Sequence, residues 1–239
     1  MIIEMLYPEL SNLYGDSANI KYLMDSYPGI EIIETNIGER PAFLNKGEVD
    51  LVYRGTMTER GQRLFIDNLS IYINELKESI EQGQRFLVTG NAVEVFGNYI
   101  IDKSGEKIDC LEVFNFHTER DILAKRFNSL YVGIYKDIKI VGFKSQFGHS
   151  FYDSDIEPLF NTIRGPGFNI EETREGVHYK NFMGTYLLGP LLVLNPDFTI
   201  VYANEIGLSK FIPAYYETAK AAYELRLKQY TDEKTGFYY

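Results

Sequence analysis

Alternating apolar segments in the first ninety residues constrain the fold of this chain more than any other feature of its sequence. Residues 2–7, 30–34 and 49–53 form apolar runs of strand length, and a fourth run occupies residues 86–88. Short apolar runs separated by helical segments are typical of buried parallel strands, which need a crossover connection between them. We therefore predict a mostly parallel sheet.

The clearest helical pattern lies between the third and the fourth run. Its apolar residues recur at spacings of 4, 4, 3 and 4, namely Phe65, Leu69, Ile73, Leu76 and Ile80. Gly83 follows, at the place where a glycine commonly ends a helix. A shorter helix is expected to begin near Asp16, with this aspartate as its N-cap. Both helices have an apolar side that can cover a sheet.

The fourth run leads into residues 86–97, a segment with the pattern of a strand, a tight turn and a helix, which we call the elbow. The run ends at Thr89 and Gly90, and a new apolar rhythm begins at Ala92. In many α/β hydrolytic enzymes such an elbow presents a nucleophile beside backbone N–H groups that stabilise an oxyanion. Here the elbow offers Thr89, which is a poor nucleophile.

These patterns predict an α/β fold with three layers, in which helices cover both faces of the mostly parallel sheet. The second half has more strand patterns, at residues 99–101, 130–135 and 138–143. We expect one domain over residues 1–239, with a loose tail from about residue 231.

Composition excludes several classes of function. The net charge is −10, and the Lys and Arg residues are dispersed, which argues against a nucleic-acid or anionic-membrane surface. The N-terminus has no signal-peptide pattern, and no apolar run reaches the length of about 18–20 residues that a membrane span needs. The only cysteine, Cys110, allows no internal disulfide. We expect a cytoplasmic protein without a metal site or cofactor.

Three blocks of sequence suggest a family: residues 12–16 (Asn-Leu-Tyr-Gly-Asp), residues 141–143 (Val-Gly-Phe) and residues 177–192, which include Gly-Thr-Tyr-Leu-Leu-Gly-Pro. With gaps, the chain resembles the class I glutamine amidotransferases from about residue 5 to about residue 195. It is most similar to their cobyric-acid-synthase-like branch and, within it, to the glutaminase subunit of lipid II isoglutaminyl synthase. The resemblance implies a flavodoxin-like fold, a role in cell-wall synthesis and a Mur-ligase-like synthetase subunit as partner.

The same resemblance implies that the catalytic positions are replaced. The family places a cysteine at the elbow and a histidine in its Gly-Thr-Tyr-Leu-His-Gly-Pro run. These positions are Thr89 and Leu188 here, and the second elbow glycine is Asn91. The family's glycine-rich oxyanion loop after the third strand corresponds to Gly55-Thr56-Met57. The scaffold residues are kept while the polar residues of the site differ.

Acyl transfer needs an activated nucleophile. A threonine hydroxyl depends entirely on a neighbouring base, and Leu188 cannot accept a proton. Loss of the nucleophile from such a unit costs on the order of 10⁶-fold in rate. We therefore predict that the chain cannot hydrolyse glutamine by the Cys–His mechanism and is a pseudoenzyme. If the pocket is otherwise intact, Thr89→Cys with Leu188→His should restore partial activity.

Few other residues could replace the missing catalytic nucleophile or base. Cys110 is interpreted as a small apolar residue, and His178 as a structural residue, with a displaced base as its alternative. His117 and His149 are expected in surface or turn positions, and the scattered histidines show no zinc-binding spacing.

The predicted ligand pocket consists of Gly55, Thr56, Thr89, Gly90, Asn91, Arg126 and Leu188. Arg126 lies near an arginine that helps to hold substrate in the resembling glutaminases, and a surface position is the alternative. Arg54 and Arg60 border the loop after the third strand, where either could pair with a carboxylate ligand or lie on the rim. Glu94 could be a helix-face carboxylate or a partner of one of these arginines.

Three functions remain open from the sequence. The first is a silent structural or regulatory subunit for a synthetase partner. The second is an active enzyme with altered chemistry at the same pocket, using Thr89, Asn91 or Glu94. The third is a small-molecule binding protein that uses the pocket without chemistry.

Overall fold

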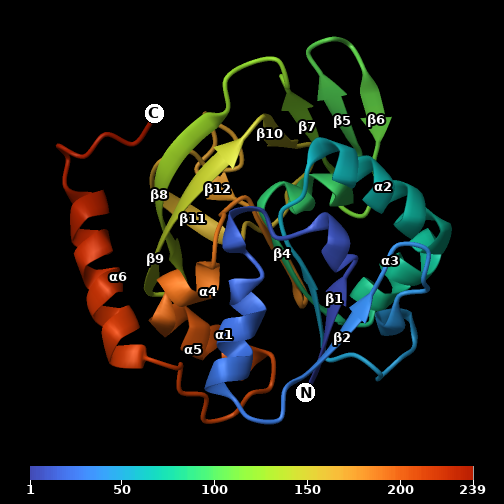
Figure 1. Cartoon of the computed structure of the whole chain (residues 1–239). Helices are drawn as coiled ribbons and strands as arrows, with labels where there is room; N and C mark the ends of the chain where they lie inside the picture. Colours follow the sequence, from blue (N-terminus) through green and yellow to red (C-terminus); the bar gives the residue numbers. More distant parts are fainter. Residues whose placement is uncertain (239) are drawn as a thin grey trace.

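A computed structural model describes residues 1–238 and contains a six-stranded central sheet (Figure 1). Its strand order is β13-β14-β4-β3-β1-β2, and only β13 runs antiparallel to its neighbour. The strands are β1 (Ile2–Leu6), β2 (Glu31–Thr35), β3 (Leu51–Arg54), β4 (Arg85–Thr89), β13 (Val177–Tyr179) and β14 (Phe182–Thr185). The predicted mostly parallel sheet is confirmed.

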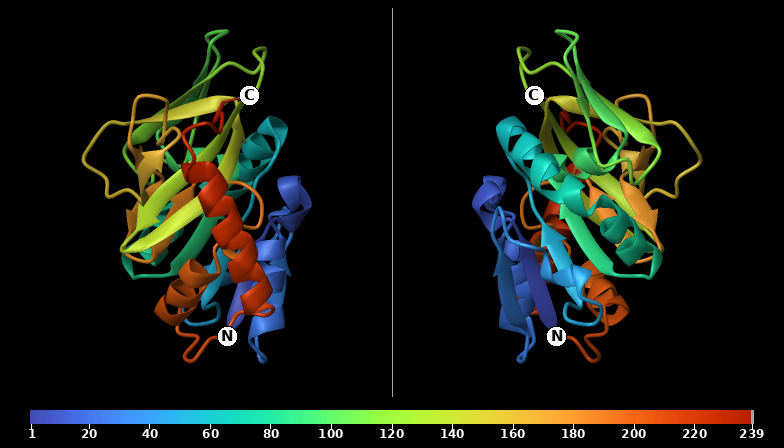
Figure 2. Two further views of the ribbon diagram at one scale, coloured as in Figure 1. Left: turned by 90° about the vertical axis from the view of Figure 1, so that its left-hand side faces the viewer. Right: turned by 90° about the vertical axis from the view of Figure 1, so that its right-hand side faces the viewer.

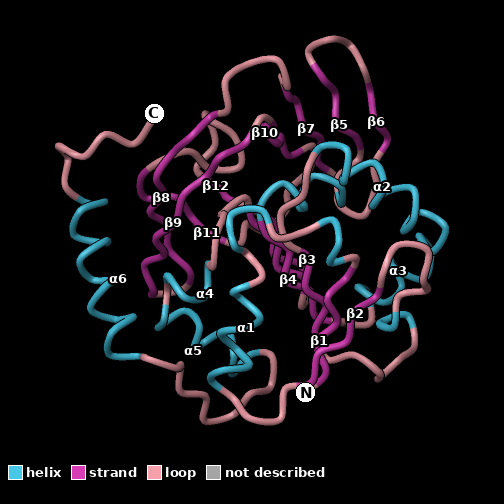
Figure 3. Tube along the Cα trace, viewed as in Figure 1, coloured by secondary structure: helices cyan, strands magenta, loops and turns pink. Residues whose placement is uncertain are grey.

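Helices cover both faces of this sheet, as the tube in Figure 3 shows. Successive residues of β4 point to opposite faces, so Phe86 and Val88 pack against α2 and α3 while Leu87 packs against α1, α4 and α5. The helices of the first face are α2 (Glu59–Leu69), η4 (Ser70–Tyr72) and α3 (Ile73–Glu81), and those of the second are α1 (Ala18–Ser26), α4 (Leu191–Leu194) and α5 (Pro196–Glu205). The three-layer prediction is confirmed.

Short 3₁₀ helices connect several of these elements. They are η1 (Pro8–Leu10), η2 (Leu13–Gly15), η3 (Ala42–Leu44) and η5 (Gly90–Phe96). The helix expected in the elbow is the 3₁₀ helix η5. The predicted N-cap is wrong, because Ser17 precedes α1 and the Asp16 carboxylate accepts a hydrogen bond from the distant Thr56 N–H.

The second half adds two four-stranded sheets, with strand orders β10-β7-β5-β6 and β12-β11-β8-β9. Their strands are β5 (Tyr99–Asp102), β6 (Lys107–Asp109), β7 (Phe116–Arg120), β8 (Phe127–Tyr135), β9 (Ile138–Gln146), β10 (Gly148–Tyr152), β11 (Phe160–Arg164) and β12 (Arg174–Glu175). The predicted strands at 99–101, 130–135 and 138–143 belong to these sheets. The sheet with β5 lies at the top of Figure 1, and the sheet with β8 and β9 lies on its left.

The C-terminal helix α6 (Tyr216–Thr231) packs beside β8 and β9, and Tyr223 anchors it by donating a hydrogen bond to the Lys139 carbonyl at 2.7 Å. The segment after it, which we expected to be loose, is held by Arg164, whose guanidinium donates to four backbone carbonyls between residues 230 and 235. The predicted domain and tail extend to residue 239, which lies outside the described residues. The N-terminus lies at the bottom of both views in Figure 2, and the segment that follows α6 lies toward the top. Within residues 1–238, no helix combines the length and apolar character needed to cross a bilayer.

Candidate functional site

The two replaced catalytic positions meet at the carboxyl end of the central sheet. Thr89 is the last residue of β4 and lies beside Thr185 of β14, three residues before Leu188. The Leu188 Cδ2 lies 2.8 Å from the position that a Cβ on Gly90 would take. Ligands of open α/β sheets bind at this end. The structure thus brings Thr89, Gly90 and Leu188 together at one corner of the sheet.

Thr89 is fully buried, and its hydroxyl faces a tyrosine rather than a base. Thr89 Oγ1 lies 3.1 Å from the Tyr53 hydroxyl, which donates to the Asp16 carbonyl at 2.7 Å and accepts from Asn19 Nδ2 at 3.0 Å. Burial raises the pKa of Tyr53, so its phenol stays neutral. No group in this arrangement can take a proton from Thr89.

The loop after β3 has its backbone donors already engaged. The Thr56 N–H donates to the Asp16 carboxylate, and the Met57 N–H donates to Asn91 Oδ1 at 3.0 Å. Asn91 Nδ2 returns a hydrogen bond to the Met57 carbonyl at 2.8 Å. A Cβ on Gly55 would lie 2.3 Å from Asp16 Oδ2, so only glycine fits there. Both N–H groups that follow Gly55 are therefore occupied by side chains of the chain itself.

The remaining cavity at this corner is very small. Its volume is about 10 Å³, which is room for about one water molecule, and Thr56, Asn91, Glu94 and Arg126 are among the residues that line it. Arg126 Nη1 donates to the Tyr14 hydroxyl at 2.7 Å. Its guanidinium also lies over the ring of Phe147, 4.6 Å from the centroid. Arg126 thus borders this small cavity, but it is bound to other residues of the chain.

Glu94 is the most perturbed acid at this site. It is buried, and burial raises its pKa to about 7. Gln62 Nε2 donates to one carboxylate oxygen at 2.7 Å, and the Tyr186 hydroxyl donates to the other at 2.9 Å. Arg120 Nη1 donates to Gln62 Oε1 at 3.1 Å, which extends the network away from the elbow. Neither Arg54 nor Arg60 contributes a hydrogen bond to Glu94 among the described residues.

The two arginines that border the loop have different positions. Arg54 is buried, and its Nη1 donates to the carbonyls of Leu6 and Tyr7 and to the Ser11 hydroxyl. Burial lowers its pKa to about 10, so the side chain remains charged at neutral pH. Arg54 therefore ties the strand ends together and is not free to pair with a ligand, whereas Arg60 is exposed.

The single cysteine and the histidines lie outside the small cavity. The Cys110 thiol donates to the Ile108 carbonyl at 3.7 Å, and burial raises its pKa. His117 Nδ1 lies 2.9 Å from Asp153, and His178 Nδ1 lies 3.7 Å from Glu157.

None of these residues replaces the missing nucleophile or base at the elbow. His149 lines a separate cavity, described below. Within residues 1–238, no three His, Cys, Asp or Glu side chains form a group that could hold a metal ion.

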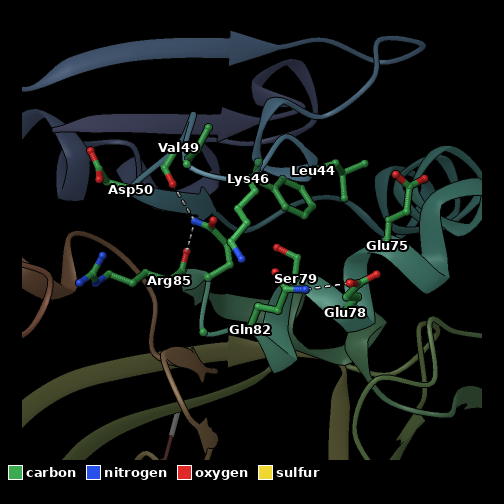
Figure 4. Close-up of a pocket in the computed structure, with 13 residues that line it drawn as sticks. Leu44, Lys46, Val49, Asp50, Glu75, Glu78, Ser79, Gln82 and Arg85 are labelled. Carbon is green, nitrogen blue, oxygen red and sulfur yellow. Dashed lines mark hydrogen bonds between the residues drawn. The ribbon is translucent and has the colours of Figure 1, made fainter.

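Another cavity, of about 510 Å³, opens at the amino ends of β3 and β4 (Figure 4). Lys46, Ser79 and Gln82 line it, and the labelled Arg85 side chain extends away from them. The amino end of a parallel sheet is opposite to the end where ligands of such sheets bind. We therefore place the candidate site at the elbow.

Sequence reasoning missed the roles of three residues at this site, namely Asp16, Tyr53 and Asn91. Only Asn91 carried a signal, because an amide side chain stands where the resembling family has a glycine. The other two act across the sheet, and nothing in their local sequence indicates their partners.

The known proteins that resemble this chain include glutamine amidotransferases and subunits of glutamine-hydrolysing enzymes. Residues 2–195 match the model of the CobB/CobQ-like glutamine amidotransferase domain. The lipid II isoglutaminyl synthase (glutamine-hydrolyzing) subunit GatD of Staphylococcus aureus is 30% identical over 226 residues, covering 91% of this chain and 89% of that protein. The subunit of the same name from Streptococcus pneumoniae is 28% identical over 230 residues, covering 89% and 85%.

Solved structures agree on the fold. A glutamine amidotransferase crystal structure matches with a TM-score of 0.54 at 13% identity, covering 87% of this chain and 100% of that one. A glutamine amidotransferase from Thermotoga maritima matches with a TM-score of 0.51 at 12% identity, covering 94% and 92%. Together with the family match over most of its length, this establishes that the chain belongs to the CobB/CobQ-like glutamine amidotransferase domain family.

Proposed function

We propose that this chain is a subunit of the lipid II isoglutaminyl synthase type that has lost glutaminase activity and acts as a structural or regulatory partner of a synthetase. The proposal rests on the side chains and the hydrogen bonds that the structure shows at the elbow. Thr89 and Leu188 stand at the nucleophile and base positions, and the neighbouring Thr56 and Met57 N–H groups are engaged by Asp16 and Asn91. An oxyanion that formed here would find neither donor free.

The partner is inferred from the relatives, whose names describe subunits of a lipid II isoglutaminyl synthase. We propose a Mur-ligase-like synthetase, and hence a role in cell-wall synthesis. Location in the cytoplasm remains a prediction from the composition. Because the chain covers most of the length of these relatives, a surface suited to the same kind of partner is a reasonable inference.

Ammonia release from glutamine tests the proposal directly. The purified chain is assayed alone and together with a candidate Mur-ligase-like synthetase, with Thr89→Ala as the matched control and an active glutaminase of the family as the positive control. We expect the chain and the Thr89→Ala variant to be equal to the buffer blank. Release above the Thr89→Ala rate would refute the proposal and favour an enzyme with altered chemistry.

A second experiment separates the contributions of the missing residues and the occupied donors. Thr89→Cys with Leu188→His restores a thiol and an imidazole, but Asn91 still holds the Met57 N–H. We expect this double variant to remain inactive and the triple variant with Asn91→Gly to release ammonia, while Asn91→Gly alone does not. Equal activity of the double and the triple variant would show that the occupied donor is not what blocks the site.

A further inference from the structure

A further cavity, of about 660 Å³, lies on the side of the molecule formed by the two smaller sheets. It opens between the ends of β5, β7 and β9 and the beginnings of β8 and β10. Ile101, Phe127 and Phe147 supply apolar lining, and Arg120, Gln146 and His149 supply polar lining. Size and composition are typical of a small-molecule site, which is mostly apolar with a few fixed polar groups.

Three of these lining residues carry a buried polar atom that has no hydrogen-bond partner among the described residues. The atoms are Arg120 Nε, Gln146 Oε1 and His149 Nδ1. Arg120 and Gln146 are only 6% and 5% exposed. Leaving such an atom unpaired costs about 1–3 kcal/mol, and buried polar atoms without partners are rare in folded proteins. All three residues line this cavity, and Arg120 and Gln146 also line the small cavity at the elbow, so we take the unpaired atoms to mark a place where a ligand supplies the partners.

The surrounding contacts fix which of these atoms donate and which accept. Gln146 Nε2 donates to the Gly148 carbonyl at 2.7 Å, so its Oε1 is the open acceptor. Arg120 Nε is a donor, and its nearest carboxylate, Asp102, is 3.5 Å away. Burial, reinforced by the charge of Lys144, lowers the pKa of His149, which is therefore neutral and can donate or accept. The cavity thus offers at least one donor and one acceptor.

Charge around the cavity is balanced. Asp102 faces Arg120, and at the mouth Lys103 forms an ion pair with Asp121 at 3.3 Å. The exposed Glu119 and Lys125 also line the cavity and have opposite signs, so a ligand with a net charge would lose solvation without meeting a net opposite charge. The walls therefore favour an uncharged molecule. Phe127, which meets the His149 ring at 5.1 Å, adds a flat surface suited to a planar ring.

We propose that this cavity binds an uncharged planar heterocycle with a lactam edge, in which an N–H group lies beside a carbonyl, as in uracil or hypoxanthine. The ligand N–H donates to Gln146 Oε1, and its carbonyl accepts from Arg120 Nε. The ring lies against Phe127 and Phe147. A wholly apolar ligand would leave the buried polar atoms unpaired, and a phosphate would offer Gln146 Oε1 no donor.

The first test varies the ligand and keeps the protein unchanged. Uridine and inosine are titrated into the whole chain by calorimetry, and 1,3-dimethyluracil serves as a control because it keeps the ring and carbonyls but has no N–H. We expect at least one nucleoside to bind with one-to-one stoichiometry and 1,3-dimethyluracil to bind at least about tenfold more weakly, the effect of losing one good hydrogen bond.

The second test varies the protein. Gln146→Leu removes the acceptor, and Phe127→Ala removes the ring that faces His149. Phe151→Ala is the matched control, because Phe151 is also a half-buried phenylalanine packed on a histidine ring, that of His117, outside the cavity. We expect the first two variants to weaken nucleoside binding by about tenfold or more, and the control to leave it unchanged. Far-ultraviolet circular dichroism confirms that each variant is folded.

Three outcomes would overturn the proposal: no binding of either nucleoside at millimolar concentration, equal binding of 1,3-dimethyluracil, or equal loss in Phe127→Ala and Phe151→Ala. If Gln146→Leu does not fold, Phe127→Ala and the methylated ligand still decide the question. None of these measurements depends on ammonia release, so this proposal and the loss of glutaminase activity can fail independently.

Discussion

Replacing Glu94 by glutamine should remove a pH-dependent loss of stability from this protein. The carboxylate accepts hydrogen bonds from Gln62 Nε2 and the Tyr186 hydroxyl. A glutamine at this position can accept from Gln62 with its oxygen and donate to the Tyr186 oxygen with its amide nitrogen. The Tyr186 hydroxyl can then donate to Ser150 Oγ, which lies 2.7 Å away. The substitution therefore removes the charge while the hydrogen bonds can be kept.

The magnitude follows from the pKa of Glu94. Burial raises the pKa from 4.5 to about 7 in the folded chain. Between these values the folded state holds a proton that the unfolded state has released, so stability falls as the pH rises through this window. One pKa unit corresponds to about 1.4 kcal/mol, which gives a loss of about 3 kcal/mol by pH 8 relative to pH 4.5.

Urea unfolding over this pH range measures the effect. Circular dichroism is the suitable signal, because the chain has no tryptophan. We expect the free energy of unfolding of Glu94→Gln to exceed that of the wild type by an amount that grows by up to about 3 kcal/mol from pH 4.5 to pH 8. Glu78→Gln, on the exposed side of α3, is the matched control. Parallel curves for the wild type and Glu94→Gln would refute the reasoning.

Three further predictions concern other buried groups. Gly90→Ala should destabilise the fold by about 1–3 kcal/mol in urea titrations, because Gly90 has φ +65° and a Cβ would lie 2.2 Å from Thr56 Oγ1; an unchanged midpoint would contradict this. Lys144→Met should lower the free energy of unfolding by about 3–5 kcal/mol, because it leaves the buried Glu175 without its counter-ion, which lies 3.2 Å away at Lys144 Nζ. Adding Glu175→Gln should recover part of this loss in the same urea titration. Cys110 should react with a thiol reagent much faster after denaturation, since its side chain is half-buried and burial raises the pKa of its thiol; equally fast labelling of the native chain would argue against this placement.

The central fold was accessible from the sequence because its signals are local. The apolar run at 86–88 and the spaced residues from Phe65 to Ile80 each report burial on their own, and the chain order then requires a parallel sheet. The two smaller sheets were not predicted as such, because strands like β7 and β10 find their partners through long-range pairing that no local pattern encodes.

The candidate site could be predicted in part. Resemblance placed Thr89 and Leu188 at one corner, and the structure brings them together beside Gly90. Which groups fill that corner could not be predicted, because Asp16 reaches the loop after β3 from 40 residues away.

The hydrogen bonds from Arg164 hold the C-terminal segment in place, so that this segment can carry a spectroscopic reporter. It places the Tyr238 ring 5.6 Å from Phe127, at the lining of the 660 Å³ cavity, and leaves Gly236 exposed with open space around its Cβ position. A cysteine introduced at 236 could carry a fluorophore selectively, since the native thiol is shielded. The emission of such a dye would follow the arrival of a ligand without any change to the residues that hold it.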